Sequence, residues 1–321
     1  MATTAGLRVA FFGFGTWGSR TLQALLDSHH EVVLVVTHPP SDGAWERIWN
    51  DSVEDLARSA GVPVLLRNRP DDADLQVRLK EADPDVMVAV NWRTLIPSEV
   101  FSLPRLGTLN VHDSLLPRYA GFAPLNWALI NGETQVGVTA HLMDAELDAG
   151  PIVLQWAVPV GAQDTAVDLF HATVKLFGPI TVAGLDLMAD GRTDFPTQDR
   201  SSATFFHKRA DEDNRIDWTW PARDIVNLVR AQPDPYPNAW TYHRGERLSV
   251  LKASVSEKRY GGTPGRIFFR EGPGVAIVAG SEARRGQNLA VVIETVRTAA
   301  GETLPALEYF TAMGGYLTDR P

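Results

Sequence analysis

The chain has 321 residues, of which 44% are hydrophobic and 21% are charged, and it contains no cysteine. This composition is typical of a globular protein with room for two domains, and it excludes disulfides, thiolate nucleophiles and cysteine-ligated zinc. The formal net charge of −9 argues against broad nucleic-acid binding, which requires a basic surface. Residues 241–321 carry a net charge of +3, so residues 1–240 carry the remaining −12.

No continuous apolar run approaches the roughly 18–20 residues that cross a bilayer. The N-terminal residues also lack the pattern of a secretory signal peptide. We therefore expect a cytoplasmic protein without membrane contact, and we predict no particular oligomeric state.

The first part of the chain alternates short apolar runs with longer amphipathic ones, which is typical of strands and crossover helices in a parallel sheet. Strands are expected at Leu7–Phe12, Val32–Thr37, Val62–Leu66, Val86–Val90 and Thr108–Val111, with a further pair at Gln135–Leu142 and Pro151–Val158. Pro63 indicates an edge position for the third strand, because proline cannot donate to the ladder. Helices are expected at Ser19–Asp27, Val53–Ala60, Asp74–Ala82 and Thr165–Asp190, the last with Asp164 as its N-cap.

Residues 192–206 are polar and irregular, which is typical of a linker, and Pro221 then begins a short helix, Ala222–Ala231. Short β-like runs follow at Trp240–Tyr242, Leu248–Leu251, Gly265–Phe269, Val275–Val278 and Leu289–Ile293. The predicted fold is α/β. A Rossmann-like, mostly parallel sheet with flanking helices occupies residues 1–200, and a small β-rich, OB-like domain occupies residues 201–321.

Glycines in the turn after the first strand fit the dinucleotide pattern G-x-G-x-x-G from Gly13 to Gly18. That pattern also needs an acidic residue about 20 positions further on to bind the ribose. Here the second strand ends in Thr37-His38-Pro39-Pro40, and the bulky Trp17 lies within the turn. NAD binding stays open as an alternative, but a tight turn beside a substrate cleft is the favoured interpretation.

The end of the fifth strand carries Asn110 and His112, which share a face because residues two apart in a strand point the same way. The carboxyl end of a parallel strand opens on the crevice where such sheets bind ligands. An amide donor can stabilise an oxyanion while an imidazole moves a proton, so the pair suits acyl transfer. The alternative is that both residues merely cap a strand.

A polar cluster lies between the next two strands, from His141 to Gly150. A carboxylate from this cluster would orient His112 and favour its protonated form. A metal site built from His112, His141, Asp144 and Asp148 is the competing interpretation, but the spacing typical of zinc sites is absent and no metal is expected. We predict a structural role for His141. Four tryptophans could wall the cleft: Trp17, Trp45, Trp49 and Trp92.

Asn110-x-His112-x-Ser114-Leu115-Leu116-Pro117, with His141-x-Met143 and Asp148-x-Gly150 further on, strongly resembles the 10-formyltetrahydrofolate-dependent formyltransferase family. The resemblance extends to the second domain through Ile216-Asp217-Trp218 and Pro235-Tyr236-Pro237-Asn238-Ala239. It therefore covers nearly the whole chain. It implies transfer of a formyl group from 10-formyltetrahydrofolate to an amine.

The resemblance also implies roles for individual residues. Asn110, His112 and Asp148 would be the catalytic residues. The folate would lie against the loop from Asn91 to Pro97. The residues implied to bind folate are Asn91, Trp92, Arg93, Leu95, Ile96 and Asp144, and those expected to bind the acceptor are Gly13, Trp17, Ser114 and Tyr119.

Charge near the second strand bears on the acceptor. Members of the family that act on tRNA carry a basic insertion there, whereas residues 37–56 of this chain hold one basic residue, Arg47, and five acidic ones. The arginine common after Leu-Leu-Pro-x-Tyr is replaced by Ala120, which disfavours an anionic acceptor. A small amine is therefore expected, and tRNA is disfavoured. The loop 37–42 and the segment 308–317 most resemble members that formylate δ-N-hydroxyornithine for hydroxamate siderophores.

Other functions remain open. Formylation of a nucleotide-linked amino sugar is the main alternative within the family. Hydrolysis of formyltetrahydrofolate would use the same three residues with water as the acceptor, but it is disfavoured because no regulatory domain precedes Leu7. Outside the family, the glycine turn alone favours an NAD-dependent oxidoreductase, and a non-catalytic binding module would leave the Asn110, His112 and Asp148 combination unexplained.

Overall fold

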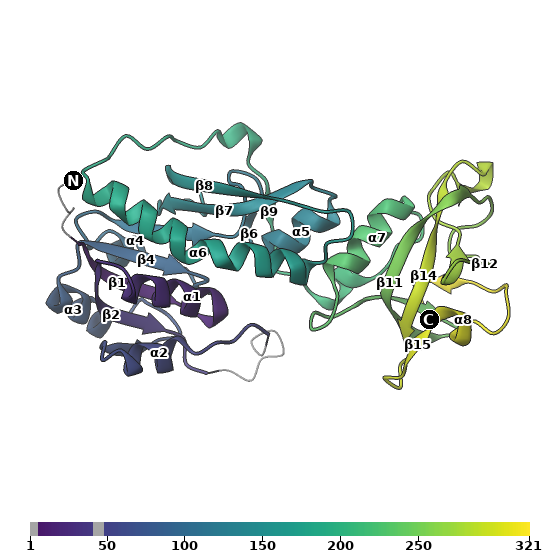
Figure 1. Ribbon diagram of the computed structural model, residues 1–321, viewed down its shortest axis with the longest axis horizontal. Helices are drawn as coiled ribbons and strands as arrows, with labels where there is room; N and C mark the ends of the chain where they lie inside the picture. The colour runs from purple at the N-terminus through teal and green to yellow at the C-terminus, as the bar shows by residue number, and fades with distance from the viewer. Residues whose placement is uncertain (1–5, 41–47) are drawn as a thin grey trace. The chain divides into compact units, whose positions relative to one another are not determined.

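The computed structural model describes residues 6–40 and 48–321, which form two compact units (Figure 1). The first unit comprises Met1–Pro124, Gln135–Pro159 and Phe170–Phe206. The second unit comprises Leu125–Thr134, Val160–Leu169 and His207–Pro321. Four residues considered in the sequence analysis lie outside the described residues, namely Asp42, Trp45, Glu46 and Arg47.

A mixed seven-stranded sheet forms the first unit, in the order β3-β2-β1-β4-β5-β7-β8. Its strands are β1 (Arg8–Gly13), β2 (Glu31–Thr37), β3 (Val64–Leu66), β4 (Val86–Val90), β5 (Thr108–His112), β7 (Gln135–Leu142) and β8 (Ile152–Pro159). The pairs from β3 to β5 are parallel, whereas β7 pairs antiparallel with both β5 and β8. The strand after Pro63 lies at the edge, as predicted, and the α/β fold class is confirmed.

Helices cover both faces of this sheet (Figure 1). The helices before residue 207 are α1 (Gly15–Leu26), α2 (Val53–Ser59), α3 (Ala73–Ala82), α4 (Ser98–Phe101), α5 (Pro124–Ile130) and α6 (Ala166–Ala189); nearly all of α5 and the first turn of α6 belong to the second unit. Apolar residues of α1, α2 and α6 pack with Val9, Phe11 and Val111 in one core cluster. Residues of α3 and α4 pack with Ala10 and Phe12 in another. Alternate residues of each strand thus face opposite cores.

Side-chain caps explain where three helices begin. The Ser52 hydroxyl accepts a hydrogen bond from the Asp55 N–H at the start of α2, and the Asp72 carboxylate accepts one from the Leu75 N–H at the start of α3. At α6 the cap is Thr165 rather than the predicted Asp164: the Thr165 hydroxyl accepts from the Asp168 N–H, and the Asp168 carboxylate accepts from the Thr165 N–H.

Helix α6 is long and apolar enough to cross a membrane by length and composition. Half of its most apolar stretch is buried inside the structure, where Phe177 and Ile180 belong to the core under the sheet. Buried core helices meet the same criteria as membrane spans. The expectation of no membrane contact stays a prediction.

The segment interpreted from sequence as a linker runs along the first unit instead. We call residues 193–206 the strap. Phe195 lies in the core, and the Pro196 carbonyl accepts a hydrogen bond from the Ile152 N–H. After a turn of 3-10 helix (Arg200–Ser202), the strap ends in β9 (Phe205–Phe206), which pairs in parallel with β6 (Ala120–Gly121). Its polar composition therefore reflects hydrogen bonds to loops of this unit rather than exposure alone.

The second unit is β-rich, as predicted. Its sheet is antiparallel in the order β12-β13-β14-β11-β10-β16, with β15 beside β14. The strands are β10 (Ala239–His243), β11 (Glu246–Arg259), β12 (Ile267–Glu271), β13 (Gly274–Ile277), β14 (Leu289–Arg297), β15 (Thr303–Pro305) and β16 (Leu317–Thr318), and the helices are α7 (Ala222–Ala231) and α8 (Ala306–Tyr309). Strands β11 and β14 are longer than expected, because register shifts between them break the alternation that marks a strand in sequence.

The glycine turn generates a prediction about stability. Gly15 has φ +62°, and a Cβ there would lie 2.8 Å from the Trp49 carbonyl oxygen. Gly61 has φ +72° with nothing within 4 Å of its Cβ position. We expect Gly61→Ala to lower the free energy of unfolding by about 1–2 kcal/mol, the cost of a left-handed residue, and Gly15→Ala to lower it clearly further. Urea unfolding of both variants measures the difference, and equal losses would contradict it.

Candidate active site

The register of β5 against β7 builds the centre of the site. Asn110 lies opposite His141, and His112 lies opposite Thr139. Leu109 and the other core residues of β5 face α6, so Asn110 and His112 lie together on the opposite face. The prediction that these two residues share a face at the carboxyl end of β5 is therefore confirmed.

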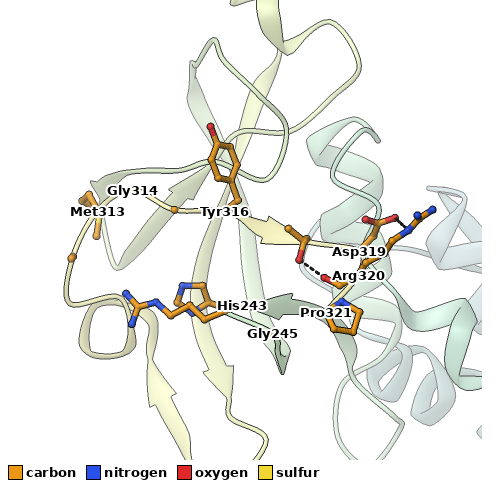
Figure 2. A pocket seen from close by; sticks show the side chains of 12 residues that line it. His243, Gly245, Met313, Gly314, Tyr316, Asp319, Arg320 and Pro321 are labelled. Carbon is orange, nitrogen blue, oxygen red and sulfur yellow. Dashed lines mark hydrogen bonds and ion pairs between the residues drawn. The ribbon is translucent and has the colours of Figure 1, made fainter.

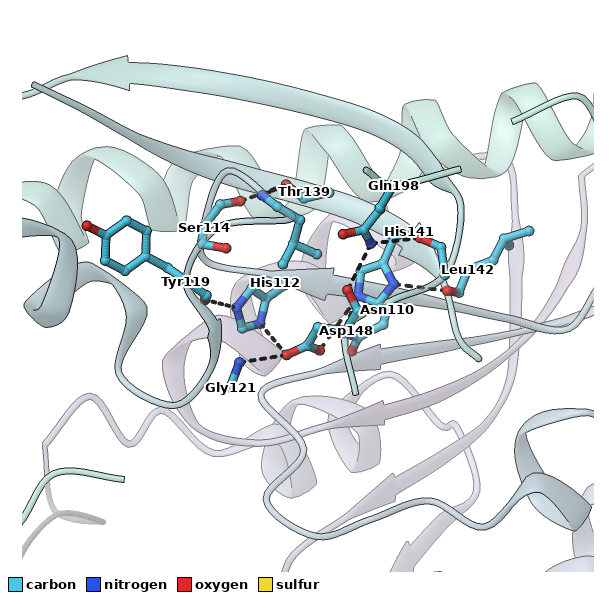
Figure 3. A network of polar contacts seen from close by, with 12 residues as sticks. Asn110, His112, Ser114, Tyr119, Gly121, Thr139, His141, Leu142, Asp148 and Gln198 are labelled. Atoms are coloured by element: carbon cyan, nitrogen blue, oxygen red, sulfur yellow. Dashed lines mark hydrogen bonds and ion pairs between the residues drawn. The ribbon is translucent and has the colours of Figure 1, made fainter. Parts of the chain in front are cut away.

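His141 fixes the side-chain orientation of Asn110 (Figure 3). The His141 Nδ1 lies 2.9 Å from the Leu142 carbonyl oxygen, so this nitrogen carries the proton. Its Nε2 then accepts a hydrogen bond from the Asn110 Nδ2 at 3.0 Å. Burial lowers the pKa of His141 to about 4, which keeps the ring neutral near pH 7. The amide nitrogen of Asn110 is thus directed by a neutral imidazole.

His112 and Asp148 face each other in the same network (Figure 3). The His112 Nε2 donates to the Tyr119 carbonyl oxygen at 2.9 Å, so Nδ1 points toward Asp148, whose Oδ2 lies 3.8 Å away. That distance is an ion-pair contact rather than a hydrogen bond. The Gly121 N–H donates to the same Oδ2 at 2.9 Å. Asn110, His112 and Asp148 are therefore brought together, and their chemical roles stay a prediction.

Backbone strain is concentrated in the loops around this network. Four residues other than glycine have positive φ there: Asn91 (49°), Tyr119 (60°), Ala123 (49°) and Asp148 (51°). Such conformations persist only where surrounding contacts hold them, and they gather at functional sites. Here the contacts are hydrogen bonds: the Asn91 Nδ2 donates to the Phe14 carbonyl, and the Tyr119 N–H donates to the Thr204 hydroxyl.

The loop after β4 carries the residues predicted to bind folate. Trp92 stacks on His38 with ring centroids 3.9 Å apart, and the guanidinium of Arg93 lies 4.5 Å from the centre of the Phe14 ring. Leu95 is 83% exposed, whereas Ile96 is buried. Asn91 packs at the base of the loop through its bond to Phe14. The loop thus presents aromatic and aliphatic walls together with main-chain polar groups.

Asp144 and the four residues predicted to bind the acceptor have different surroundings. Asp144 is exposed, and its carboxylate accepts from the Ala145 N–H. Gly13 is buried at the end of β1. The Ser114 hydroxyl is buried and donates to the Arg118 carbonyl, so the contact that the structure gives it stabilises the turn after β5. The Tyr119 ring stacks on Phe206 of the strap. Ligand contacts at all of these positions stay predictions.

Trp17 contacts a buried carboxylate next to His112. Its Nε1–H donates to the Asp113 Oδ2 at 3.2 Å, and its ring packs on the edge of Phe170. The Asp113 Oδ1 is buried and has no hydrogen-bond partner among the described residues. Burial raises the pKa of Asp113 to about 6. Trp49 stacks on the same Phe170 ring, so both tryptophans pack against this residue of helix α6.

Several residues of the network are absent from the sequence-based site. Thr139 accepts from the Leu116 N–H and donates to the Ser114 carbonyl, which anchors the turn after β5. The main-chain N–H of Gly121 and the side chain of Gln198 both contact the loop of Asp148. Strand alternation could have placed Thr139 on this face, but no sequence signal pairs Gln198 with a loop 50 residues earlier.

A second group of potential metal ligands, His29, His30 and Asp186, lies elsewhere in the first unit. The Leu7 N–H donates to the His30 Nδ1 at 3.1 Å, so the neutral ring carries its proton on Nε2, which faces the Asp186 Oδ1 at 3.2 Å. A metal would need a lone pair on that nitrogen. The arrangement therefore matches a histidine–carboxylate pair better than a metal site.

The second unit carries a pocket of about 670 Å³ (Figure 2). It is lined by residues at the end of β10 and by residues of the C-terminal segment 312–321, among them His243, Arg244, Met313 and Tyr316. None of Asn110, His112 and Asp148 is among its lining residues. Part of the segment 308–317, which resembles hydroxyornithine formyltransferases, therefore forms a wall of this pocket.

Comparison with known proteins identifies the family. The formyl transferase family matches residues 7–179, and the formyl transferase C-terminal domain matches residues 208–314. The chain belongs to the formyl transferase family, and it is a formyltransferase. It is 36% identical over 281 residues to methionyl-tRNA formyltransferase of Pseudomonas fluorescens Pf-5, covering 87% of each chain. It is 35% identical to the Pseudomonas putida F1 protein of the same name, covering 86% of this chain and 89% of the relative.

Solved structures share the fold. The sugar 3N-formyl transferase WlaRD, solved with dTDP and 5-N-formyl-THF, has a TM-score of 0.66 and 18% identity, covering 89% of this chain and 97% of its own. The N-formyltransferase of Helicobacter canadensis has a TM-score of 0.66 and 17% identity, covering 89% and 98%. Glycinamide ribonucleotide transformylase 1 of Symbiobacterium toebii is 28% identical with a TM-score of 0.51, covering 60% and 94%.

These findings confirm the resemblance inferred from sequence, and the dinucleotide interpretation of the glycine turn loses its support. They also correct the expectation that tRNA is disfavoured as the acceptor. The sequence analysis disfavours a tRNA acceptor on charge, yet the relatives at 35–36% identity are named methionyl-tRNA formyltransferase. Methionyl-tRNA therefore stands beside a small amine as a candidate acceptor.

The buried Asp113 predicts how stability changes with pH. Its folded-state pKa of about 6 lies above the ordinary value of 3.8, so the folded protein holds this proton more tightly than the unfolded chain. The stability that results is fully present below about pH 4 and is lost as the pH rises through about 6. We expect Asp113→Asn, which keeps an acceptor for Trp17, to gain on the order of 2 kcal/mol relative to wild type between pH 4 and pH 8.

Urea unfolding of both proteins at several pH values measures this difference. His141 contributes the opposite trend over the same range, because burial lowers its pKa, but it does so in both proteins and cancels in the comparison. A difference between variant and wild type that is constant from pH 4 to pH 8 would show that Asp113 does not titrate as described.

Proposed function

We propose that this protein transfers the formyl group of 10-formyltetrahydrofolate to the amine of a small acceptor, δ-N-hydroxyornithine, in hydroxamate siderophore biosynthesis in the cytoplasm. The observation that carries formyl transfer is the convergence of Asn110, His112 and Asp148 at the end of β5. An amide N–H, an imidazole and a carboxylate within one network are what amine formylation requires.

The acceptor nitrogen attacks the formyl carbon and forms the new C–N bond, and the bond from that carbon to N10 of the folate breaks. One N–H of Asn110 is taken by His141, and the other is the donor for the developing oxyanion. Protonated His112 keeps Nε2–H on the Tyr119 carbonyl and supplies Nδ1–H to the same oxygen. The 3.8 Å separation from Asp148 leaves that proton available.

Asp148 has two tasks in this proposal. Its carboxylate lies 3.8 Å from His112 Nδ1 and orients the imidazole toward the oxyanion. It also receives the proton that the acceptor amine loses, and this proton ends on N10 of the departing tetrahydrofolate. The neutral His141, whose Nε2 lies 3.8 Å from the Asp148 Oδ1, does not compete for that proton because burial lowers its pKa to about 4.

The loop from Asn91 to Pro97 suits the flat, polar ring of a folate. Trp92 and the buried Ile96 give it apolar walls, which suit the faces of the ring. Arg93 and the exposed Leu95 lie further along the same loop. We assign the pteridine to this loop, with Asp144 near its edge.

Charge favours a small acceptor with cationic character. In the described part of the segment after β2, Asp51 and Asp55 are exposed, Arg20 lies 3.6 Å from Asp51, and Arg58 is paired with Glu54 at 2.8 Å. Gripping a tRNA backbone requires several phosphates to meet lysine or arginine. An acidic rim attracts an ornithine-like amino acid and repels a polyanion.

Methionyl-tRNA is the second candidate acceptor. It is favoured by identity of 35–36% over most of the chain to proteins named methionyl-tRNA formyltransferase. The net charge of +3 on residues 241–321 is the part of the chain best suited to contact nucleic acid. A small cationic acceptor is favoured by acidic residues near β2, whereas a tRNA requires basic residues there. An activity assay with both acceptors distinguishes the two candidates.

Loss of the oxyanion donor is the first catalytic test. We expect Asn110→Ala to lower kcat about a hundred- to a thousandfold, the typical effect of removing one such donor, while donor binding stays near normal. His112→Gln, which keeps a polar side chain without an ionisable ring, should abolish turnover. Tetrahydrofolate release measures both. Near wild-type turnover in either variant, with an unchanged unfolding midpoint, would contradict the mechanism.

An acceptor panel tests the substrate. With 10-formyltetrahydrofolate as donor, we expect formylation of δ-N-hydroxyornithine and little turnover with ornithine, a dTDP-amino sugar or methionyl-tRNA. Activity with methionyl-tRNA alone would establish the second candidate. Release of tetrahydrofolate in buffer without acceptor would identify a hydrolase, and the hydroxyornithine proposal would then be wrong.

A further inference from the structure

We propose that Gln198 is a positioning residue for formyl transfer, which holds the loop of Asp148 in the conformation that faces His112. This inference rests on the proposed function, because it assigns Gln198 a role through Asp148. Gln198 lies on the strap, in a stretch without regular secondary structure.

The contacts of Gln198 are specific to this loop. Its side chain is buried, and its Nε2 donates to the carbonyl oxygens of Asp148 and Gly150, each at 2.8 Å (Figure 3). An amide nitrogen has two N–H groups, so both are used. The Oε1 is buried without a hydrogen-bond partner among the described residues. The reverse orientation would place this oxygen against two carbonyl oxygens, so the orientation is fixed.

The loop needs such support because its backbone is constrained at both of these residues. Asp148 has φ +51°, a conformation that residues other than glycine rarely adopt. A Cβ at Gly150 would lie 1.9 Å from the Leu142 carbonyl oxygen, so the chain here passes directly against the end of β7. Buried carbonyl groups also require donors, which Gln198 provides for Asp148 and Gly150.

The carboxylate of Asp148 is held from a second direction, and the strap also supports that contact. The Gly121 N–H donates to Oδ2 at 2.9 Å, and Gly121 belongs to β6, which pairs with Phe206 in β9 of the strap. The main chain of Asp148 is thus bound by Gln198 and its side chain by Gly121. The strap therefore sets the direction in which Asp148 meets His112 Nδ1.

Kinetics of Gln198→Met test the role, because methionine matches the side-chain length without donors. We expect kcat to fall about 10- to 100-fold, the effect of misplacing a catalytic group by about an ångström, with KM for 10-formyltetrahydrofolate within about twofold of wild type.

Two further variants separate positioning from folding. Gln198→Glu, which presents a charged carboxylate to two carbonyls, should lose kcat at neutral pH and recover partly at low pH, where its protonated form donates one hydrogen bond. Thr181→Val is the matched control: its buried hydroxyl donates to the Phe177 carbonyl within α6, away from the Asp148 loop. It should lower the unfolding temperature while kcat and its pH profile stay unchanged.

The outcomes are distinct. Wild-type kcat and pH profile in Gln198→Met, or in Gln198→Glu should the first variant fail to fold, would overturn the positioning role. A kcat loss matched by a comparable rise in the KM for 10-formyltetrahydrofolate would overturn it too, because a general disturbance of the site predicts that result. Asp148→Asn separates this failure from failure of the proposed function: if that variant keeps full turnover, Asp148 is not catalytic and the proposed mechanism itself is wrong.

Discussion

The geometry of the site depends on a buried histidine that stays neutral. His141 donates through Nδ1 to the Leu142 carbonyl, so its Nε2 can only accept, and the amide of Asn110 must present its nitrogen. Were His141 protonated, two donors would face each other and the amide would turn. Burial lowers the pKa of His141 to about 4, which prevents this at any pH where the amine acceptor is useful. Desolvation of His141 thus orients the amide of Asn110 on the neighbouring strand β5.

Antiparallel pairing makes this arrangement possible. Strand β7 runs antiparallel to β5 and places His141 opposite Asn110. The loop that continues from β7 then carries Asp148 back toward His112. The strap closes the remaining side through Gln198 and β9. Strand β5, the loop after β7 and the strap are distant in sequence, yet they meet in one network of polar contacts.

Sequence reasoning could predict local structure and which side chains share the face at the end of β5. The bounds of Gln135–Leu142 and Ala222–Ala231 follow from periodicity and from Pro221, and the structure matches both. The motif of Asn110 and His112 indicates chemistry because strand alternation is a local rule. Gln198 could not be found in this way, since its partners lie 48 and 50 residues earlier and its neighbours are polar, as in a linker. Tertiary hydrogen bonds of irregular segments leave no periodic signal.

Family membership and acceptor choice depend on different parts of the molecule. In the proposed mechanism Asn110, His112 and Asp148, here called the trio, act on any amine that reaches the formyl carbon, so their presence leaves the acceptor open. Selection then falls to the loops around the trio and to their charge. Residues 37–56 hold five acidic residues against one basic residue, which opposes the phosphate contacts that a tRNA needs. Identity of 36% to a protein named methionyl-tRNA formyltransferase supports the shared chemistry, whereas the acidic composition of residues 37–56 is the basis for proposing a small acceptor.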